Sequence, residues 1–435
     1  MKTDNKQKHL YIDGCDSISL SKKYGTPLYI VSQRKIEERC IKIKYVFLEK
    51  FKNTSAFYAS KAFLTMAMCK IIEKQELGLD VVSGGELYTA LKAKFPASRI
   101  LFHGNNKSYE ELRLAIENDI SRIIVDNIYE LKMIEEISSK FHKKTNILFR
   151  LTPGVTSITH KHIDTGRKDS KFGIPLEIDT ILGAVKVALD SNNINLKGFH
   201  FHLGSQLFDN ITYLKAIDMA FELIKFLKDE INFITEELNT GGGYGVSYQK
   251  KEIEKPLEYF IESIMERVYK NCNKHKLIIP KVSIEPGRWI VAHAGTTLYT
   301  IGNIKEISGI RTYASIDGGM TDNPRPSLYG AKYYGEIANK IDQEKKYKVT
   351  ISGKCCESGD ILIEDLDVPK ITPGDILAVY STGAYNFSMA SNYNKNIRPA
   401  VVLVKDGESE IIVERQNYED LLRGERLPKE FKTLK

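Results

Sequence analysis

The chain has 435 residues, 42% hydrophobic and 27% charged, which is the composition of a globular protein with one large domain and a smaller one. Its net charge of +7 is a small excess of 63 basic over 56 acidic residues, and no block of consecutive Lys/Arg marks a nucleic-acid site. No long apolar run predicts a membrane helix, and Met1 to His9 carries no apolar signal segment. We therefore expect a cytoplasmic protein that binds neither nucleic acid nor membranes.

The cysteines have neither C-x-x-C spacing nor a nearby histidine at zinc spacing. A chain of this length does not need disulfides for stability. We therefore expect the cysteines to be free thiols in a reducing compartment and not to form a metal site. The six are Cys15, Cys40, Cys69, Cys272, Cys355 and Cys356.

Eight short apolar runs, each ending in small or polar residues, begin near residue 54: residues 55–60, 79–83, 100–103, 122–125, 147–151, 198–203, 237–239 and 281–285. Segments of helical periodicity lie between them, including residues 85–95, 109–118, 129–141, 178–189 and 213–229. Strand followed by helix, repeated eight times, predicts an α/β fold with a closed parallel (β/α)8 barrel of the TIM type.

After Arg288 the pattern changes to apolar–polar alternation in residues 297–304, 313–317, 347–351, 376–380 and 400–404. Asp406-Gly407, between two apolar runs, indicates a hairpin turn. This part predicts a mostly antiparallel β domain, with which the opening residues 10–31 are expected to pack. We expect a cofactor-binding barrel over residues 35–288 and a β-rich domain formed by residues 1–34 and 289–435.

Lys61 follows the first barrel strand directly, in Tyr58-Ala59-Ser60-Lys61-Ala62. Active-site residues of such barrels lie at the carboxyl ends of the strands. A lysine partly removed from water there would have a lowered pKa and could form a Schiff base with an aldehyde. Taken alone, this segment is explained more simply by a solvated lysine at a strand end.

His200 and His202 lie on one face of the sixth strand, because side chains alternate along a strand. A ring at the strand end could stack on a flat cofactor, and Ser205 could donate to a phosphate. A metal-binding pair is the rival interpretation, but no nearby carboxylate in the sequence completes a metal triad. A structural role for one of the two histidines stays equally open.

The seventh and eighth strands end in features that suit a cofactor. Gly241-Gly242-Gly243 lets backbone N–H groups converge on an anion, although neither Walker A nor dinucleotide spacing is present and a plain tight turn is the alternative. Glu285, near Arg288, is a costly residue to bury unless it has a task or belongs to a structural ion pair. Together the strand ends predict one site for a phosphate-bearing aldehyde.

These residues resemble the pyridoxal-phosphate decarboxylases of the alanine-racemase-like fold (fold type III), and most closely the diaminopimelate decarboxylases. The resemblance covers nearly the whole chain. Family motifs occur in the family's order at residues 58–62, 83–87, 170–173, 202–206, 241–243, 285–288, 356–360 and 383–385.

The resemblance implies that Lys61 carries pyridoxal 5'-phosphate, that His202 stacks on its ring, and that Glu285 keeps the pyridine nitrogen protonated. The ring is then an electron sink for the carbanion left by lost CO₂. Further cofactor contacts are implied for Ser205, Gly242, Gly243, Gly287, Arg288 and Tyr385. Cys356 would return the proton to Cα, and in this family it enters the site from the second subunit of a homodimer.

For the substrate, the resemblance implies decarboxylation of meso-2,6-diaminopimelate to L-lysine, the last step of lysine biosynthesis. Arg288 and Arg325, with Tyr329, would hold the distal carboxylate through paired hydrogen bonds. Glu357 would meet the distal ammonium, and Tyr385 is a further substrate contact.

Two departures from the family pattern stand out: Cys355 directly precedes Cys356, which leaves open which thiol donates the proton, and Arg167 stands where an apolar residue is common. Three alternatives remain. They are decarboxylation of ornithine, D-ornithine or another basic amino acid, a cofactor-free regulatory relative, and a racemase, which needs a second base.

Overall fold

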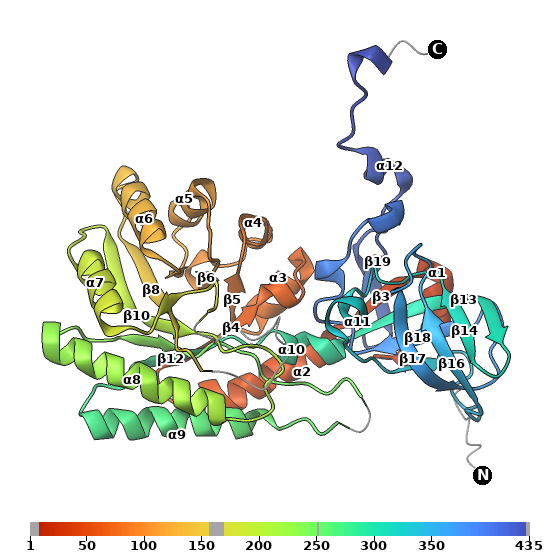
Figure 1. Cartoon of the computed structure of the whole chain (residues 1–435), viewed down its shortest axis with the longest axis horizontal. Helices are drawn as coiled ribbons and strands as arrows, with labels where there is room; N and C mark the ends of the chain where they lie inside the picture. Colours follow the sequence, from red (N-terminus) through yellow and green to blue (C-terminus); the bar gives the residue numbers. More distant parts are fainter. Residues whose placement is uncertain (1–7, 156–168, 250–251, 432–435) are drawn as a thin grey trace. The chain divides into compact units, whose positions relative to one another are not determined.

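The computed structural model describes residues 8–155, 169–249 and 252–431. The chain forms two compact units, one made of Met1–Arg34 and Ala294–Lys435 and the other of Lys35–His293 (Figure 1). Arg167 and the first seven residues lie outside the described residues.

The unit of Lys35–His293 is built on parallel strands whose order in the sheet is β10-β11-β12-β4-β5-β6-β7-β8. A pairing between β8 and β10 closes the barrel, with Phe149 beside Phe199. The strands are β4 (Thr54–Ala59), β5 (Gly78–Val81), β6 (Ile100–Phe102), β7 (Arg122–Val125), β8 (Thr145–Thr152), β10 (Ile194–Phe201), β11 (Glu237–Asn239) and β12 (Lys281–Ile284). The expected closed parallel barrel is confirmed.

Helices cover the outside of these strands, and α8 and α9 pack along one another (Figure 1). Side-chain caps mark where several helices begin: Ser83 Oγ accepts the N–H of Glu86, and Asn127 Oδ1 accepts that of Glu130. The helices are α2 (Gln33–Ile43), α3 (Met66–Lys74), α4 (Gly84–Lys92), α5 (Tyr109–Glu117), α6 (Ile128–Lys140), α7 (Ile178–Leu189), α8 (Ile211–Ile231), α9 (Leu257–His275) and α10 (Arg288–Val291).

The other unit is a sheet with the path β17-β16-β14-β13-β3-β19-β20, with β18 beside β13 and β15 beside β18. Most neighbours are antiparallel, and β14–β16 and β19–β3 are parallel. Its strands are β3 (Leu28–Ser32), β13 (Gly295–Ile307), β14 (Arg311–Ile316), β15 (Gly335–Ile337), β16 (Tyr347–Ser352), β17 (Ile361–Val368), β18 (Ile376–Tyr380), β19 (Ala400–Lys405) and β20 (Glu408–Val413).

The opening segment belongs to this β unit, as expected. β3 lies between β13 and β19, and its side chains join a core that contains Leu28, Ile30, Leu298 and Val402. Burial of this apolar face stabilises the sheet. The predicted Asp406-Gly407 hairpin is confirmed, with both residues at positive φ (51° and 89°) between β19 and β20.

Strands β15 and β17 were not predicted from the sequence. Helix α9 has its place in the expected strand–helix alternation, although no bounds were predicted for it. β17 reads Ile-Leu-Ile-Glu-Asp-Leu-Asp-Val and breaks the alternation at paired acids, where register shifts interrupt its pairing with β16. Among the described residues, no helix is both long enough and apolar enough to cross a membrane.

Candidate active site

The barrel brings several of the predicted site residues to one end of neighbouring strands. Lys61 lies on the turn Ser60–Ala62 that follows β4, and Glu285 follows β12, which pairs with β4. His202 follows β10, and the glycine loop follows β11. Because the order β10-β11-β12-β4 is continuous, these strand ends are neighbours.

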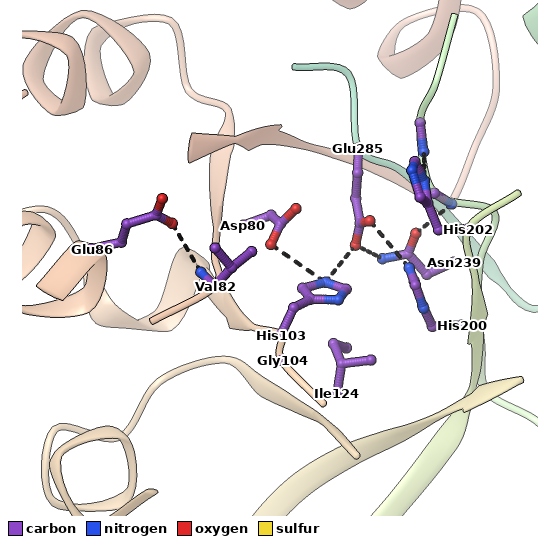
Figure 2. A network of polar contacts seen from close by, with 12 residues as sticks. Asp80, Val82, Glu86, His103, Gly104, Ile124, His200, His202, Asn239 and Glu285 are labelled. Carbon is purple, nitrogen blue, oxygen red and sulfur yellow. Dashed lines mark hydrogen bonds and ion pairs between the residues drawn. The ribbon is translucent and has the colours of Figure 1, made fainter. Parts of the chain in front are cut away.

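Glu285 is the centre of a buried network (Figure 2). Its Oε1 lies 2.9 Å from His103 Nε2 and accepts a hydrogen bond from Asn239 Nδ2 over 2.7 Å. Its Oε2 lies 3.1 Å from His200 Nε2. Three nitrogen atoms from three strand ends therefore hold this carboxylate in one orientation.

The network keeps Glu285 ionised. Burial by itself would raise the pKa of Glu285, but the electrostatic attraction and hydrogen bonds from His103 and His200 outweigh it and hold that pKa well below its usual range. Burial lowers the pKa of His200 to about 4, against the attraction of Glu285. His200 is therefore a neutral ring whose Nε2–H donates to Glu285. In the part of the chain that the structure describes, its Nδ1 has no hydrogen-bond partner.

The structure corrects one premise about metal binding. The sequence offered no carboxylate near the histidine pair, but the fold places Glu285 beside His200 and His103, whose ligand atoms lie within 4.8 Å of one another. The ring nitrogens point at the carboxylate at hydrogen-bond distance, so they are engaged as donors. The geometry is that of a carboxylate held by hydrogen bonds.

Asn239 connects Glu285 to the glycine loop. Its Oδ1 accepts the N–H of Gly241 over 2.9 Å while its Nδ2 donates to Glu285. The loop packs too tightly for side chains, because a Cβ at Gly242 would overlap the carbonyl oxygen of Glu285 and one at Gly243 that of Gly204. Glycine is required here by close backbone approach.

Ser205 and Arg288 also lie at this end of the barrel. Arg288 donates to Ser205 Oγ from Nε over 3.2 Å and from Nη2 over 3.0 Å. Its Nη1 donates to Tyr248 OH over 2.7 Å. Gly287 approaches Ala59 at the end of β4, where an added Cβ would lie 2.9 Å from the Ala59 Cβ. Arg288 and Glu285 thus engage different partners in the barrel.

Lys61 and His202 share a charged environment. Burial and the positive charges of Lys61 and Arg150 hold the pKa of His202 well below its usual value, so the ring is neutral. Its Nδ1 accepts the N–H of Gly242 over 3.3 Å. Burial raises the pKa of Glu86 to about 7, and Lys61 opposes that shift. A neutral ring beside the glycine loop suits stacking on a flat ligand.

The remaining predicted residues lie in the β unit. Cys356 and Glu357 are exposed in the loop between β16 and β17, and the Cys356 N–H donates to Asn394 Oδ1 over 2.8 Å. Asp360 anchors the loop by accepting the N–H groups of Cys355 and Met320.

Arg325 begins α11 (Arg325–Tyr329) and is buried, while Tyr329 at its end is half-buried. Ser327 Oγ of the same helix donates to the carbonyl of Gly359, which ties α11 to the Cys356 loop. The structure thus brings Arg325, Tyr329 and the Cys356 loop together within one unit.

Tyr385 is half-buried at positive φ (62°) after β18. The next residue is Asn386. With the oxygen and nitrogen of its side-chain amide exchanged, Nδ2 donates to Tyr333 OH over 3.2 Å. Tyr333 OH in turn accepts from Arg325 Nη1 over 2.6 Å. The segment of Tyr385 and helix α11 are therefore linked through Tyr333.

The sequence reading missed His103, Asp80, Arg150, Asn239 and Tyr333. The first three could have been recognised in the sequence, because each is a polar residue inside an otherwise apolar barrel strand or at its end. All three are buried. Tyr333 lies in an irregular segment with no periodicity to mark it.

The residues of the barrel fit pyridoxal phosphate. A carboxylate has about four acceptor directions, and three are used on Glu285, which leaves one on Oε2 for a protonated ring nitrogen. Lys61 supplies a primary amine at the same barrel end. Ser205 supplies a hydroxyl for a phosphate, and the close-packed glycine loop presents backbone with no side chain in the way.

The family described as "Pyridoxal-dependent decarboxylase, pyridoxal binding domain" matches residues 33–292. Diaminopimelate decarboxylase of Bacillus subtilis (strain 168) is 46% identical over 419 residues, covering 96% of this chain and 95% of that protein. The Bacillus methanolicus enzyme is 48% identical over 413 residues, covering 95% and 96%. The crystal structure of the diaminopimelate decarboxylase of M. jannaschii with L-lysine has a TM-score of 0.91 at 36% identity and covers 97% of both chains.

The fold and the barrel site, with these likenesses, define a carboxy-lyase dependent on pyridoxal phosphate, with the alanine-racemase-like fold. Within this class the chain belongs to the diaminopimelate decarboxylase family. The resemblance seen in the motifs is confirmed.

Proposed function

We propose that the protein decarboxylates meso-2,6-diaminopimelate to L-lysine and CO₂, the last step of lysine biosynthesis. The observation that carries the reaction class is Glu285, buried, ionised and with one acceptor direction remaining at the barrel end where Lys61 lies. Bound pyridoxal phosphate supplies an electron-withdrawing ring that takes up the electron pair released with CO₂.

In the barrel, Lys61 holds the cofactor covalently through its amine. Glu285, fixed by its three donors, keeps the ring nitrogen protonated. His202 is neutral and stacks on the ring, which avoids placing a second cation beside a protonated pyridine. Ser205, Gly242, Gly243 and Tyr385 bind the phosphate, while Gly287 allows close packing and Arg288 orients Ser205.

Cys356 delivers the proton to Cα after CO₂ leaves. Its side chain is exposed, as a thiol that must reach a substrate requires. Burial, reinforced by Asp360, raises the pKa of the neighbouring Cys355 thiol to about 11. Cys355 is partly buried, its Sγ accepts from Asn396 Nδ2 over 3.7 Å, and Asp360 holds its backbone. These constraints favour Cys356 as the donor.

The residues that bind the distal end of the substrate give the enzyme its preference for diaminopimelate. Arg325 and Arg288 bind the distal carboxylate with Tyr329, and Glu357 meets the distal ammonium. The support is chemical, because a second amino-acid centre requires both a cation and an anion. Arg325 is buried and held by Tyr333, whereas Glu357 is exposed on the loop that α11 contacts.

We assign the working form as a homodimer in which the β unit of each chain supplies Cys356 and Glu357 to its partner. The C-terminal segment supports contact with a second copy, since Tyr418, Leu422, Leu427 and Phe431 expose large apolar side chains. We place the enzyme in the cytoplasm, which suits six free cysteines.

The test is a substrate panel with the purified protein and pyridoxal phosphate. We expect lysine and CO₂ from meso-diaminopimelate, little product from ornithine or D-ornithine, and no turnover by Lys61→Ala. Arg325→Ala should raise KM for diaminopimelate strongly. Ornithine turnover faster than diaminopimelate turnover would overturn the substrate assignment, and racemised diaminopimelate without CO₂ would overturn the reaction class.

A further inference from the structure

His103 enters the proposed reaction only as one of the three donors to Glu285, yet its position in the barrel site differs from that of the other two. It follows β6 directly and is buried. Its ring packs edge-on against His200, with centroids 4.7 Å apart. Figure 2 shows it between two acids, Asp80 and Glu285.

The two acids are not equivalent partners of this imidazole. His103 Nε2 lies 2.9 Å from Glu285 Oε1 but 3.6 Å from Asp80 Oδ1. Only the first distance is that of a hydrogen bond, so the N–H is directed to Glu285. Among the described residues, Asp80 Oδ1 has no hydrogen-bond partner.

We propose that His103 is a positioning residue that keeps Glu285 ionised and aimed at the cofactor's ring nitrogen, and that it does so by separating Glu285 from Asp80. This inference rests on the cofactor of the proposed function and not on its substrate. The geometry supports it because the other two donors to Glu285, His200 and Asn239, lie on the side of the carboxylate away from Asp80 (Figure 2).

The physical reason lies in the charges of the site. Two buried carboxylates that face one another cannot both ionise cheaply, so without an intervening donor they share a proton. Burial already raises the pKa of Asp80, with Glu285 contributing to the shift and His103 opposing it. Loss of His103 would let a proton settle on the Asp80–Glu285 pair, and the ring nitrogen would lose its counter-charge.

Several other titratable groups act on this pair, and all remain in place when His103 is changed. They come from β4, β8, β10 and β11 or the segments that follow these strands, and from helix α4: Lys61, Glu86, Arg150, His200, His202 and Tyr244. Asn239 on β11 is uncharged and holds Glu285 from the other side. A change in the site's titration after substitution of His103 therefore reports on that residue.

The experiment compares His103→Leu, which removes the donor, with His103→Gln, whose amide N–H can replace it. The control is His275→Leu, at the end of α9 beside Glu222, where 5% of the histidine side chain is exposed. The readouts are the absorption spectrum of the bound cofactor as a function of pH and the dissociation constant of pyridoxal phosphate. Neither needs diaminopimelate, so failure of the substrate assignment leaves this test intact.

For His103→Leu we expect the ring nitrogen to lose its proton at lower pH than in the parent, and cofactor affinity to fall about tenfold to a hundredfold, as for loss of a hydrogen bond to a charged group. His103→Gln should restore most of the cofactor affinity and most of the parent's pH-dependent spectrum. Adding Asp80→Asn to His103→Leu should restore part of each, because it removes the second acid. Parent-like spectra and affinity in His103→Leu would overturn the proposal.

If His103→Leu does not fold, the proposal is tested by comparing the cofactor spectra of His103→Gln and the shorter His103→Asn. The proposal requires Gln to resemble the parent and Asn, which cannot reach Glu285, to show the shifted spectrum. Identical spectra for the two amides would overturn it.

Discussion

Arg325 and Tyr333, eight residues apart in the chain, meet at a buried hydrogen bond of 2.6 Å from the guanidinium Nη1 to the phenol oxygen. The guanidinium also lies over the Tyr333 ring, 5.7 Å from its centroid. Because both side chains are buried, this contact limits the rotamers open to Arg325. The residue proposed to select the substrate is therefore held before any ligand binds.

Tyr333→Phe should raise KM for diaminopimelate about three- to thirtyfold with little change in kcat, since it removes one hydrogen bond to a charged group at the distal end. Steady-state kinetics of the purified variant measure this. Tyr334→Phe is the matched control, because its hydroxyl donates to Glu336 over 2.7 Å and accepts from Lys345 Nζ over 2.9 Å. An unchanged KM in Tyr333→Phe would show that Arg325 needs no such support.

Gly242→Ala should reduce both stability and cofactor retention, because the added Cβ would overlap the carbonyl oxygen of Glu285. We expect a loss of about 1–3 kcal/mol in the free energy of unfolding, as for other overpacked sites. Gly183→Ala is the control: its Cβ meets nothing within 4 Å on helix α7, so it should stabilise by about 0.5–1 kcal/mol. Urea unfolding and absorbance of the bound cofactor test both; a Gly242→Ala protein as stable as the parent contradicts the overlap.

Lys107 and Glu130 form a buried ion pair of 2.7 Å, with 1% and 2% of their side chains exposed. Lys107→Met should cost about 3–5 kcal/mol in unfolding free energy, because it leaves Glu130 buried without its cation. Adding Glu130→Leu should recover much of the loss. Equilibrium unfolding of the two variants measures it, and a double variant less stable than Lys107→Met would contradict the explanation.

Glu86 should make stability fall as pH rises. Burial raises its pKa from 4.5 to about 7, against the hydrogen bond from the Val82 N–H. Between these values the unfolded chain has released the proton that the folded chain retains, so the unfolding free energy decreases with pH by about 3 kcal/mol. Glu86→Gln should remove this decrease, which unfolding midpoints across the window will show.

Glu336 provides a control of opposite sign. Burial raises its pKa, but hydrogen bonds from Lys345, Tyr334 and Tyr380 prevail and lower it to about 2. Its contribution is complete above pH 4.5 and is lost as pH falls toward 2. Glu336→Gln should therefore weaken acid sensitivity and leave the Glu86 window unchanged. Equal pH profiles for the two variants would contradict both assignments.

The barrel strands were predictable because their signal is local. Residues 122–125 and 237–239 were predicted at the bounds that the structure has, and the other strands differ by a few residues at their ends. A buried parallel strand is a short apolar run whatever its neighbours are. The glycine loop and Lys61 were visible for the same reason, since each follows such a run directly.

The amino-acid sequence by itself determined the alternation of strands and helices, the family and the residues that carry its motifs. Only the tertiary structure decided how the charge of Glu285 is maintained. His103 and Glu285 are 182 positions apart, and Asn239 and Glu285 are 46 apart, so their contacts depend on which strands become neighbours when the barrel closes. Protonation follows from burial and from donors a few ångströms away, and a linear pattern of residues contains neither.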